Sequence, residues 1–180
     1  MKTKIVFLTG FMGSGKSTIG PILANTLGWN FFDLDGLIEA RKGKKIAEIF
    51  DEIGEAGFRS LEREILKETA KGENVIISLG GGTIADQENI NFMKKKGKII
   101  FLKASPESFY QRLKFKTDRP LLRGKDEKLL SQNELKQKIK EILHYRKKFY
   151  DQADISLKTD NTTIGKTVDA VSKIILKDFQ

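Results

Sequence analysis

Short apolar runs of strand length alternate with segments of helical spacing along the whole chain. The apolar runs cover residues 4–9, 30–34, 74–79, 98–103 and 154–157, and they are rich in Ile, Val and Phe. The helical segments cover residues 16–27, 35–42, 46–50, 55–70, 87–96, 106–115, 132–150 and 164–176. This alternation predicts an α/β three-layer sandwich, in which right-handed helical crossovers join the five strands of a parallel sheet.

One segment, residues 115–132, breaks the alternation. It contains Pro120, Gly124 and many charged residues, without sustained apolar spacing. A long loop inside a compact domain is often a lid over an active site. A disordered insertion is the alternative, but the apolar pair Leu121-Leu122 favours a loop that docks. We therefore predict a single domain over residues 1–180, with a lid at about residues 115–132.

Composition excludes several classes of protein. The 180 residues include no cysteine, which excludes a disulfide framework, a thiolate metal site and a cysteine nucleophile, and a reducing cytoplasm is the expected location. The apolar run near the N-terminus ends at Thr9-Gly10, too short for the core of a signal peptide. No window approaches the ~20 apolar residues that span a bilayer, so no membrane partner is expected.

The formal charge of +9 invites a nucleic-acid interpretation, but its distribution does not favour one. Of the 33 cationic residues, 26 are Lys scattered along the chain and only seven are Arg. No aromatic-interleaved basic stripe accompanies them. We expect a Lys-rich surface and no nucleic-acid partner.

The strongest chemical signal lies at residues 10–18, which read GFMGSGKST and match the phosphate-binding pattern G-x-x-x-x-G-K-[ST] in full. The segment stands between a predicted strand and a predicted helix, as that pattern requires. Its glycines let backbone N–H groups turn toward a phosphate at the positive end of the helix. Lys16 is expected to reach the β and γ phosphates, and the Ser17 hydroxyl to ligate Mg²⁺.

A P-loop by itself leaves GTPases, ATPase motors and small-molecule kinases open. The Asn-Lys-x-Asp tetrapeptide typical of GTPases does not occur, and 180 residues leave little room for a motor. The residues that would bind the phosphoryl acceptor must distinguish these classes. The first candidates are Asp33 and Asp35, at the end of the second predicted strand. Residues i and i+2 of an extended chain point to the same side, so one carboxylate can meet the metal and the other an acceptor hydroxyl. Asp35 as a helix cap is the alternative.

The few arginines carry more information than the many lysines, because the guanidinium fork suits carboxylates and phosphates. Arg59 lies on the segment 55–70, where a salt bridge with Glu55 or Glu62 is the alternative role. Arg119 falls in the predicted lid and Arg146 on the segment 132–150. The triplet Gly80-Gly81-Gly82 follows the third strand, where backbone groups can approach a ligand closely.

Taken together, the chain resembles the shikimate kinases along nearly its whole length. The motifs that carry the resemblance are, in chain order, GFMGSGKST at residues 10–18, F-x-D-L-D at 31–35, the segment 46–50, E-x-x-F-R-x-x-E at 55–62, SLGGGT at 78–83, RPLL at 119–122 and R-x-x-x-Y-x-x-A-D at 146–154. The resemblance implies a P-loop kinase fold of the nucleoside monophosphate kinase type. It also implies phosphoryl transfer from ATP to the 3-hydroxyl of shikimate, with Mg²⁺, by a monomer.

The same resemblance implies a set of site residues. ATP would be bound by Gly13, Ser14, Gly15, Lys16, Ser17, Thr18, Arg112 and Arg119, with Arg112 stacked on adenine. Shikimate would be bound by Asp35, Arg59, Gly80, Gly81, Gly82 and Arg146, with both arginines facing its carboxylate. Ser17 and Asp33 would hold the metal, Asp33 through water. The catalytic groups would be Lys16, Asp35, which orients the acceptor hydroxyl and can take its proton, and Arg119, which closes over the phosphoryl group.

Two alternatives stay open at this point. A gluconate or nucleotide kinase would share the P-loop, but neither explains Asp33 and Asp35 together with Arg59, the glycine triplet and Arg146. A non-enzymatic ATP-binding or nucleic-acid module would keep the P-loop and the basic charge without needing the acceptor residues.

Overall fold

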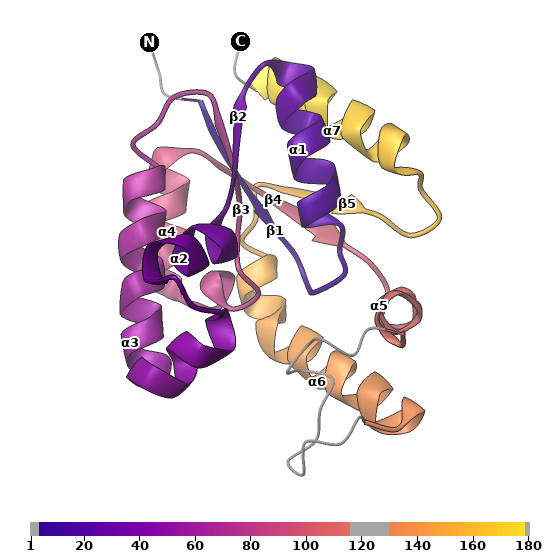
Figure 1. Ribbon diagram of the computed structural model, residues 1–180. Coiled ribbons are helices and arrows are strands. Elements are labelled where there is room, and N and C mark those ends of the chain that lie inside the picture. Colours follow the sequence, from indigo (N-terminus) through magenta and orange to yellow (C-terminus); the bar gives the residue numbers. More distant parts are fainter. Residues whose placement is uncertain (1–3, 116–129, 179–180) are drawn as a thin grey trace.

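A computed structural model describes residues 4–115 and 130–178 of the chain. Within them, five strands form one parallel sheet in the order β2-β3-β1-β4-β5 (Figure 1). The strands are β1 (Ile5–Thr9), β2 (Asn30–Asp33), β3 (Val75–Ser78), β4 (Lys98–Lys103) and β5 (Ile155–Lys158). The predicted five-stranded parallel sheet is confirmed, with strand ends displaced by at most a residue or so.

Helices follow each strand of the sheet. They are α1 (Lys16–Leu27), α2 (Leu34–Lys42), α3 (Ile46–Thr69), the short 3₁₀ helix η1 (Thr83–Ala85), α4 (Gln87–Lys96), α5 (Pro106–Leu113), α6 (Gln132–Tyr150) and α7 (Ile164–Asp178). The sequence predicts two helices where α3 lies. The structure runs them together across a kink at Gly54, whose φ of 67° and ψ of 176° are non-helical.

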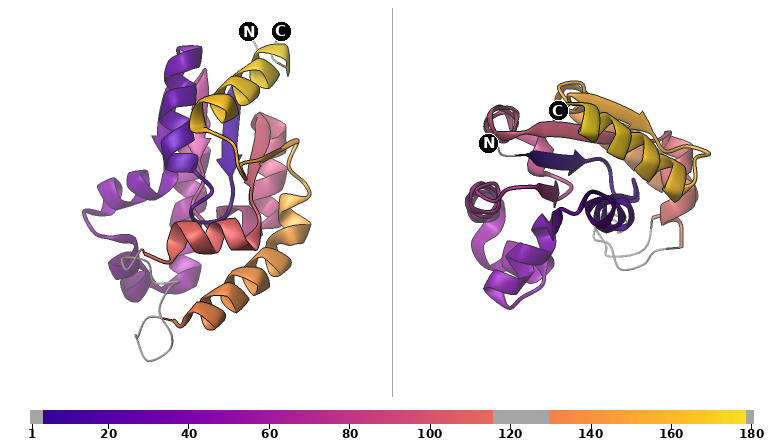
Figure 2. Two further views of the ribbon diagram at one scale, coloured as in Figure 1. Left: turned by 90° about the vertical axis from the view of Figure 1, so that its right-hand side faces the viewer. Right: turned by 90° about the horizontal axis from the view of Figure 1, so that it is seen from above.

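Alternating residues of the buried strands supply two separate cores, which makes the domain a three-layer sandwich (Figure 2). Val6 and Leu8 of β1 face α1 and α7, whereas Ile5 and Phe7 face the layer that contains α2, α3 and α4. Strands that are apolar on both faces require cover on both, and this determines the arrangement of the helices.

A third, smaller core extends beyond the carboxyl ends of the strands. Phe11 of the P-loop packs against Phe109 of α5, with ring centroids 5.0 Å apart, and Leu135 and Ile139 of α6 complete the cluster. It fixes α5 and α6 beside the loops in which parallel sheets bind ligands.

The predicted lid at about residues 115–132 falls largely on residues 116–129, which lie outside the described residues, and so does Arg119. Of the helices in the described part of the chain, none combines the length and hydrophobicity needed to cross a bilayer.

Candidate active site

All five strands are parallel, so the loops that follow them share one edge of the sheet. The P-loop follows β1, the acidic pair follows β2 and the glycine triplet follows β3. In the register of the sheet Ser78 of β3 lies between Leu8 and Asp33, so these three segments are neighbours in space. Residues far apart in the sequence therefore meet at the edge where ligands bind in such folds.

The P-loop has the backbone geometry that its glycines predict. Gly10, Gly13 and Gly15 adopt φ of 154°, 78° and 101°, values that favour glycine. Gly15 is the N-cap of α1 and has no side chain with which to cap it, so the helix start offers its N–H groups to an anion. The Lys16 ammonium donates to the carbonyl oxygen of Gly10 at 2.8 Å. Together these groups form a cradle for phosphate.

A cavity of about 220 Å³ adjoins the P-loop. Among the predicted ATP-binding residues, it is lined by Gly13, Ser14, Gly15, Thr18 and Arg112. Arg112 donates to the carbonyl oxygen of Gly13 at 3.0 Å and to that of Thr159 at 2.8 Å, so it ties the P-loop to the segment after β5. Its predicted stacking on adenine stays a prediction.

The acidic pair has a different local geometry from the one that the sequence suggested. β2 ends at Asp33, and Asp35 already lies in the first turn of α2, so the two carboxylates do not extend from one strand. Asp33 is the N-cap of this helix, and its Oδ1 accepts a hydrogen bond from the Gly36 N–H at 3.2 Å. The expectation of a shared strand face is therefore wrong, as is the alternative that Asp35 is the cap. A capping carboxylate at position 33 starts the helix earlier.

The glycine triplet makes room for the side chains of the acceptor site. A Cβ at Gly80 would overlap Asp35 Oδ1 and lie 3.1 Å from Glu62 Oε1, and one at Gly82 would lie 2.7 Å from Arg59 Nη1. A Cβ at Gly81 would lie 3.8 Å from Arg146 Nη1. The triplet thus contacts three predicted substrate residues that come from three different helices.

Arg59 is held in place by a buried carboxylate. It donates to Glu62 Oε2 at 2.9 Å, and Glu62 is only 1% exposed. The guanidinium also lies over the stacked rings of Phe50 and Phe58, at 5.7 and 5.3 Å from their centroids. Glu55 forms a longer contact of 3.8 Å at the surface. Both predicted acidic partners are therefore present, and the buried one fixes the orientation of Arg59.

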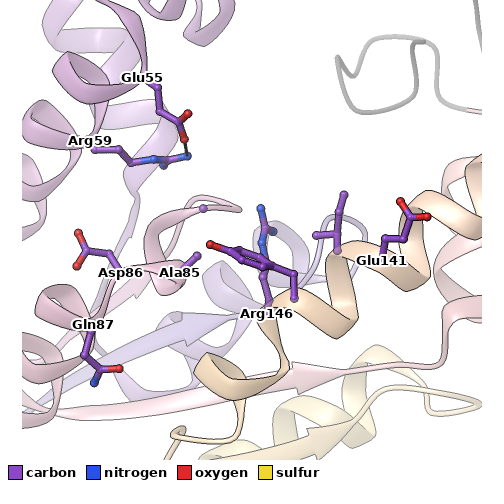
Figure 3. A pocket seen from close by; sticks show the side chains of 10 residues that line it. Glu55, Arg59, Ala85, Asp86, Gln87, Glu141 and Arg146 are labelled. Carbon is purple, nitrogen blue, oxygen red and sulfur yellow. Dashed lines mark ion pairs between the residues drawn. The ribbon is translucent and has the colours of Figure 1, made fainter. Parts of the chain in front are cut away.

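Arg59 of α3 and Arg146 of α6 face one cavity of about 700 Å³, together with Gly82 and residues of η1 and α4 (Figure 3). One helical turn after Arg146 on α6, the ring of Tyr150 stacks on that of Phe101, with centroids 4.2 Å apart. Burial raises the pKa of the Tyr150 hydroxyl, and the nearby Arg146 acts in the opposite direction. Tyr150 therefore stays protonated and uncharged at neutral pH, so it does not offset the positive charge of Arg146.

The wall of this cavity between α3 and α4 is held by a second ion pair. Arg63 of α3 donates to Asp86 Oδ2 at 2.6 Å, and Asp86 caps α4 through the Glu88 N–H. Burial raises the pKa of Asp86, but the hydrogen bonds from Arg63 and Glu88 outweigh it, so that the net shift is downward. Asp86 is therefore ionised at neutral pH and anchors the cavity wall.

Two buried residues of this site, Glu62 and Thr83, were not among the predicted binding or catalytic residues, although the sequence had offered Glu62 as a salt-bridge partner of Arg59. Glu62 Oε1 accepts a hydrogen bond from Thr83 Oγ1 at 2.6 Å, and both side chains are buried. One signal was available for Glu62, because a charged residue occupies the apolar stripe of α3 that Phe58, Ile65 and Leu66 define. Such a carboxylate needs a buried partner.

These features define a class. A parallel sheet in the order found here, a P-loop after its first strand and a cavity beside the glycine triplet at the same edge make this protein a P-loop kinase of the nucleoside monophosphate kinase type.

Comparison with known proteins narrows the class to a family. The family model described as shikimate kinase matches residues 12–177. A shikimate kinase of Chlorobium limicola is 46% identical over 173 residues, which are 96% of this chain and 87% of that protein. The crystal structure of shikimate kinase from Bacteroides thetaiotaomicron superimposes with a TM-score of 0.87 at 39% identity, covering 96% of this chain and 98% of the other. A shikimate kinase from Acinetobacter baumannii in complex with shikimate gives 0.85 at 30% identity, covering 98% and 94%.

The chain belongs to the shikimate kinase family. Membership makes it an ATP-dependent kinase, in agreement with the P-loop geometry.

Proposed function

We propose that the protein transfers the γ-phosphoryl group of ATP to the 3-hydroxyl of shikimate. The observation that supports this most directly is the convergence of Arg59 and Arg146 on one cavity, beside the loop that contacts Asp35. Two guanidinium groups from different helices suit a carboxylate, and a carboxylate nearby suits a hydroxyl acceptor. A carboxylated polyol such as shikimate has both groups.

On the nucleotide side, the backbone N–H groups around Gly13 and Gly15 and the start of α1 receive the phosphates. Lys16 is already held at the loop through the carbonyl oxygen of Gly10. In the proposed complex its ammonium exchanges that partner for the β and γ phosphates, where it offsets the charge that moves onto the leaving group. Phosphoryl transfer needs alignment and charge neutralisation more than covalent help.

The donor set near the P-loop fits Mg²⁺. Ser17 supplies a hydroxyl in the first turn of α1, where its side chain is exposed, and Asp33 supplies a carboxylate at the start of α2. One hydroxyl and one carboxylate, completed by phosphate oxygens and water, are typical of magnesium sites in kinases. When bound, Mg²⁺ neutralises the β and γ oxygens and orients the γ-phosphoryl group.

On the acceptor side, Asp35 orients the 3-hydroxyl and takes its proton, while Arg59 and Arg146 hold the carboxylate away from the reacting oxygen. The triplet Gly80-Gly81-Gly82 forms the floor between these groups, because side chains there would displace Asp35 or Arg59. Arg119 lies outside the described residues. Its proposed contact with the transferred phosphoryl group rests on its place in the sequence.

The proposed reaction takes ATP and shikimate as its partners and involves neither nucleic acid nor membrane. We also propose that residues 1–180 act as one kinase domain and as a monomer. A cytoplasmic location is proposed as well, because a chain without cysteine forms no disulfides and is compatible with a reducing compartment.

The decisive experiment measures Mg²⁺-dependent ADP release with shikimate, gluconate and nucleoside monophosphates in separate assays. Of these acceptors, we expect only shikimate to stimulate ADP release strongly. In the product, ³¹P–¹H coupling should place the phosphate on the 3-hydroxyl. No stimulation by shikimate, or greater stimulation by another acceptor, would reject the proposal.

A further inference from the structure

Behind the acceptor cavity, a chain of hydrogen bonds runs from Thr83 through Glu62 to Arg59. The Thr83 hydroxyl donates to Glu62 Oε1 at 2.6 Å, and Arg59 Nη1 donates to Glu62 Oε2 at 2.9 Å. Thr83 is 0% exposed and Glu62 1%, whereas the Arg59 side chain is 30% exposed. This series of hydrogen bonds therefore begins in the core and ends at the cavity.

The inner end of this chain is fixed by the backbone. Thr83 opens η1 directly after Gly82, its N–H donates to the Gly80 carbonyl oxygen at 3.3 Å, and its own carbonyl oxygen accepts from Asn89 Nδ2 at 3.1 Å. A β-branched side chain on a backbone held at both ends has few rotamers. The hydroxyl of Thr83 is therefore a preset donor.

Glu62 depends on that donor. A carboxylate that is only 1% exposed, on the face of α3 that also carries Phe58, Ile65 and Leu66, has almost no access to water, so each of its oxygens needs a partner within the protein. Thr83 satisfies Oε1 and thereby fixes the direction of Oε2, to which Arg59 binds. Without the hydroxyl, Glu62 would turn to satisfy Oε1, and Arg59 would lose its only buried partner among the described residues.

The other contacts of Arg59 do not set its direction in the same way. The rings of Phe50 and Phe58 support the guanidinium from one side but allow it to slide across them. Glu55 is 77% exposed and lies 3.8 Å from Arg59 Nη2, which makes it a weak partner.

We propose that Thr83 is a positioning residue for substrate binding: through Glu62, it aims Arg59 at the carboxylate of the acceptor. This inference rests on the proposed function for the identity of the acceptor. It predicts that the hydroxyl of a residue that touches no substrate controls the KM for shikimate, while kcat and the KM for ATP depend on it little.

The test uses three substitutions in the full chain. Thr83→Val removes the hydroxyl at nearly constant volume, Thr83→Ser keeps the hydroxyl, and Thr69→Val is the matched control. Thr69 lies at the end of α3, and its hydroxyl donates only to its own helix, at the Ile65 carbonyl oxygen. Thr83→Val should raise the KM for shikimate about tenfold, Thr83→Ser should restore it to within about threefold, and Thr69→Val should leave it at the wild-type value.

A double-mutant cycle with Arg59→Lys separates positioning from general loosening. In the Arg59→Lys background Thr83→Val should no longer change the KM for shikimate, because the group that Thr83 positions is gone. An unchanged KM in Thr83→Val, an equal effect in both backgrounds or a failure of Thr83→Ser to restore binding would each overturn the proposal. Should Thr83→Val not fold, Thr83→Ala, which also removes the hydroxyl, carries the same prediction.

Failure of the proposed function can be told apart from failure of this inference. If the wild-type protein phosphorylates no shikimate, the proposed function is wrong, whatever Thr83 does. The orientation of Arg59 can then be read without substrate, from the ¹⁵N-resolved NMR signal of its guanidinium. A signal that broadens in Thr83→Val and sharpens again in Thr83→Ser supports positioning, and one that does not change contradicts it.

Discussion

The glycine triplet offers a sharp test of the site, because Gly82 has an ordinary backbone conformation. Its φ of −104° and ψ of −16° are open to alanine, so Gly82→Ala introduces no backbone strain. The new Cβ would lie 2.7 Å from Arg59 Nη1, well inside contact distance. Because the guanidinium is the end of a flexible side chain, we expect Arg59 to move rather than the backbone.

The size of the effect follows from the contacts that Arg59 would lose. Losing the bond to Glu62 leaves a buried carboxylate with Thr83 as its remaining partner and should cost roughly 1–3 kcal/mol of stability. The reduced entropy of the unfolded chain should return about 0.4–1 kcal/mol. In the complex, losing one charge-assisted contact to the substrate carboxylate costs about 1.5–3 kcal/mol, so the KM for shikimate should rise roughly ten- to a hundredfold.

The assay is steady-state ADP release with each substrate varied at saturation of the other, next to thermal unfolding of each variant. The KM for ATP should stay close to the wild-type value. Gly165→Ala is the control, because a Cβ at that position of α7 would meet no heavy atom within 4 Å. Gly81→Ala should have a smaller effect than Gly82→Ala, since its Cβ would lie 3.8 Å from Arg146 Nη1. A KM for shikimate within about twofold of wild type, in a Gly82→Ala variant whose Arg59 has moved, would refute the role given to Arg59.

Further predictions concern Asp35, Arg119, the cavity beside the P-loop and the response to acid. Asp35→Asn should leave ATP binding intact and lower kcat by about a hundredfold or more, because the acceptor hydroxyl loses its anionic partner; near-normal turnover would remove Asp35 from the mechanism. Arg119→Ala should mainly lower kcat, and an effect on the KM for ATP alone would show a different role. Arg112→Ala should raise the KM for ATP several-fold more than that for shikimate, because it frees the P-loop from the segment after β5; equal changes in the two steady-state KM values would contradict this. Hydrogen bonds from the Ser108 hydroxyl and the backbone after β4 lower the pKa of Asp160. Its contribution to stability is therefore present above the unfolded-state pKa and is lost as pH falls through the lower folded-state pKa, so Asp160→Asn should flatten the acid side of the pH–stability curve. An unchanged curve in urea titrations would refute this linkage.

Some parts of the site were predictable from sequence because their causes are local. The P-loop needs three glycines, a lysine and a hydroxyl within nine residues, and its conformation follows from those neighbours. The acidic pair shows where local reasoning failed. The residues at positions 33 and 35 were identified as candidates, but the strand ended one residue sooner than expected because Asp33 caps α2.

The remaining parts depend on contacts that the linear sequence does not display. Glu62 and Thr83 are 21 positions apart, and Arg112 and Gly13 are 99 apart, so only the strand order brings each pair together. A glutamate on a helix usually faces solvent, and although the apolar stripe around position 62 indicates burial, it does not identify Thr83 as the partner.

The sequence by itself determined the alternation of strands and helices, the phosphate cradle and the small set of candidate arginines. Each of these depends on residue types and on the spacing of neighbouring residues. The tertiary structure decided how those groups are aimed. It showed that the glycine triplet leaves space for Asp35 and Arg59, and that a buried carboxylate holds Arg59. The physical reason is that direction at the site comes from desolvated hydrogen bonds between separate segments, which form only once the parallel sheet has brought its loops to one edge.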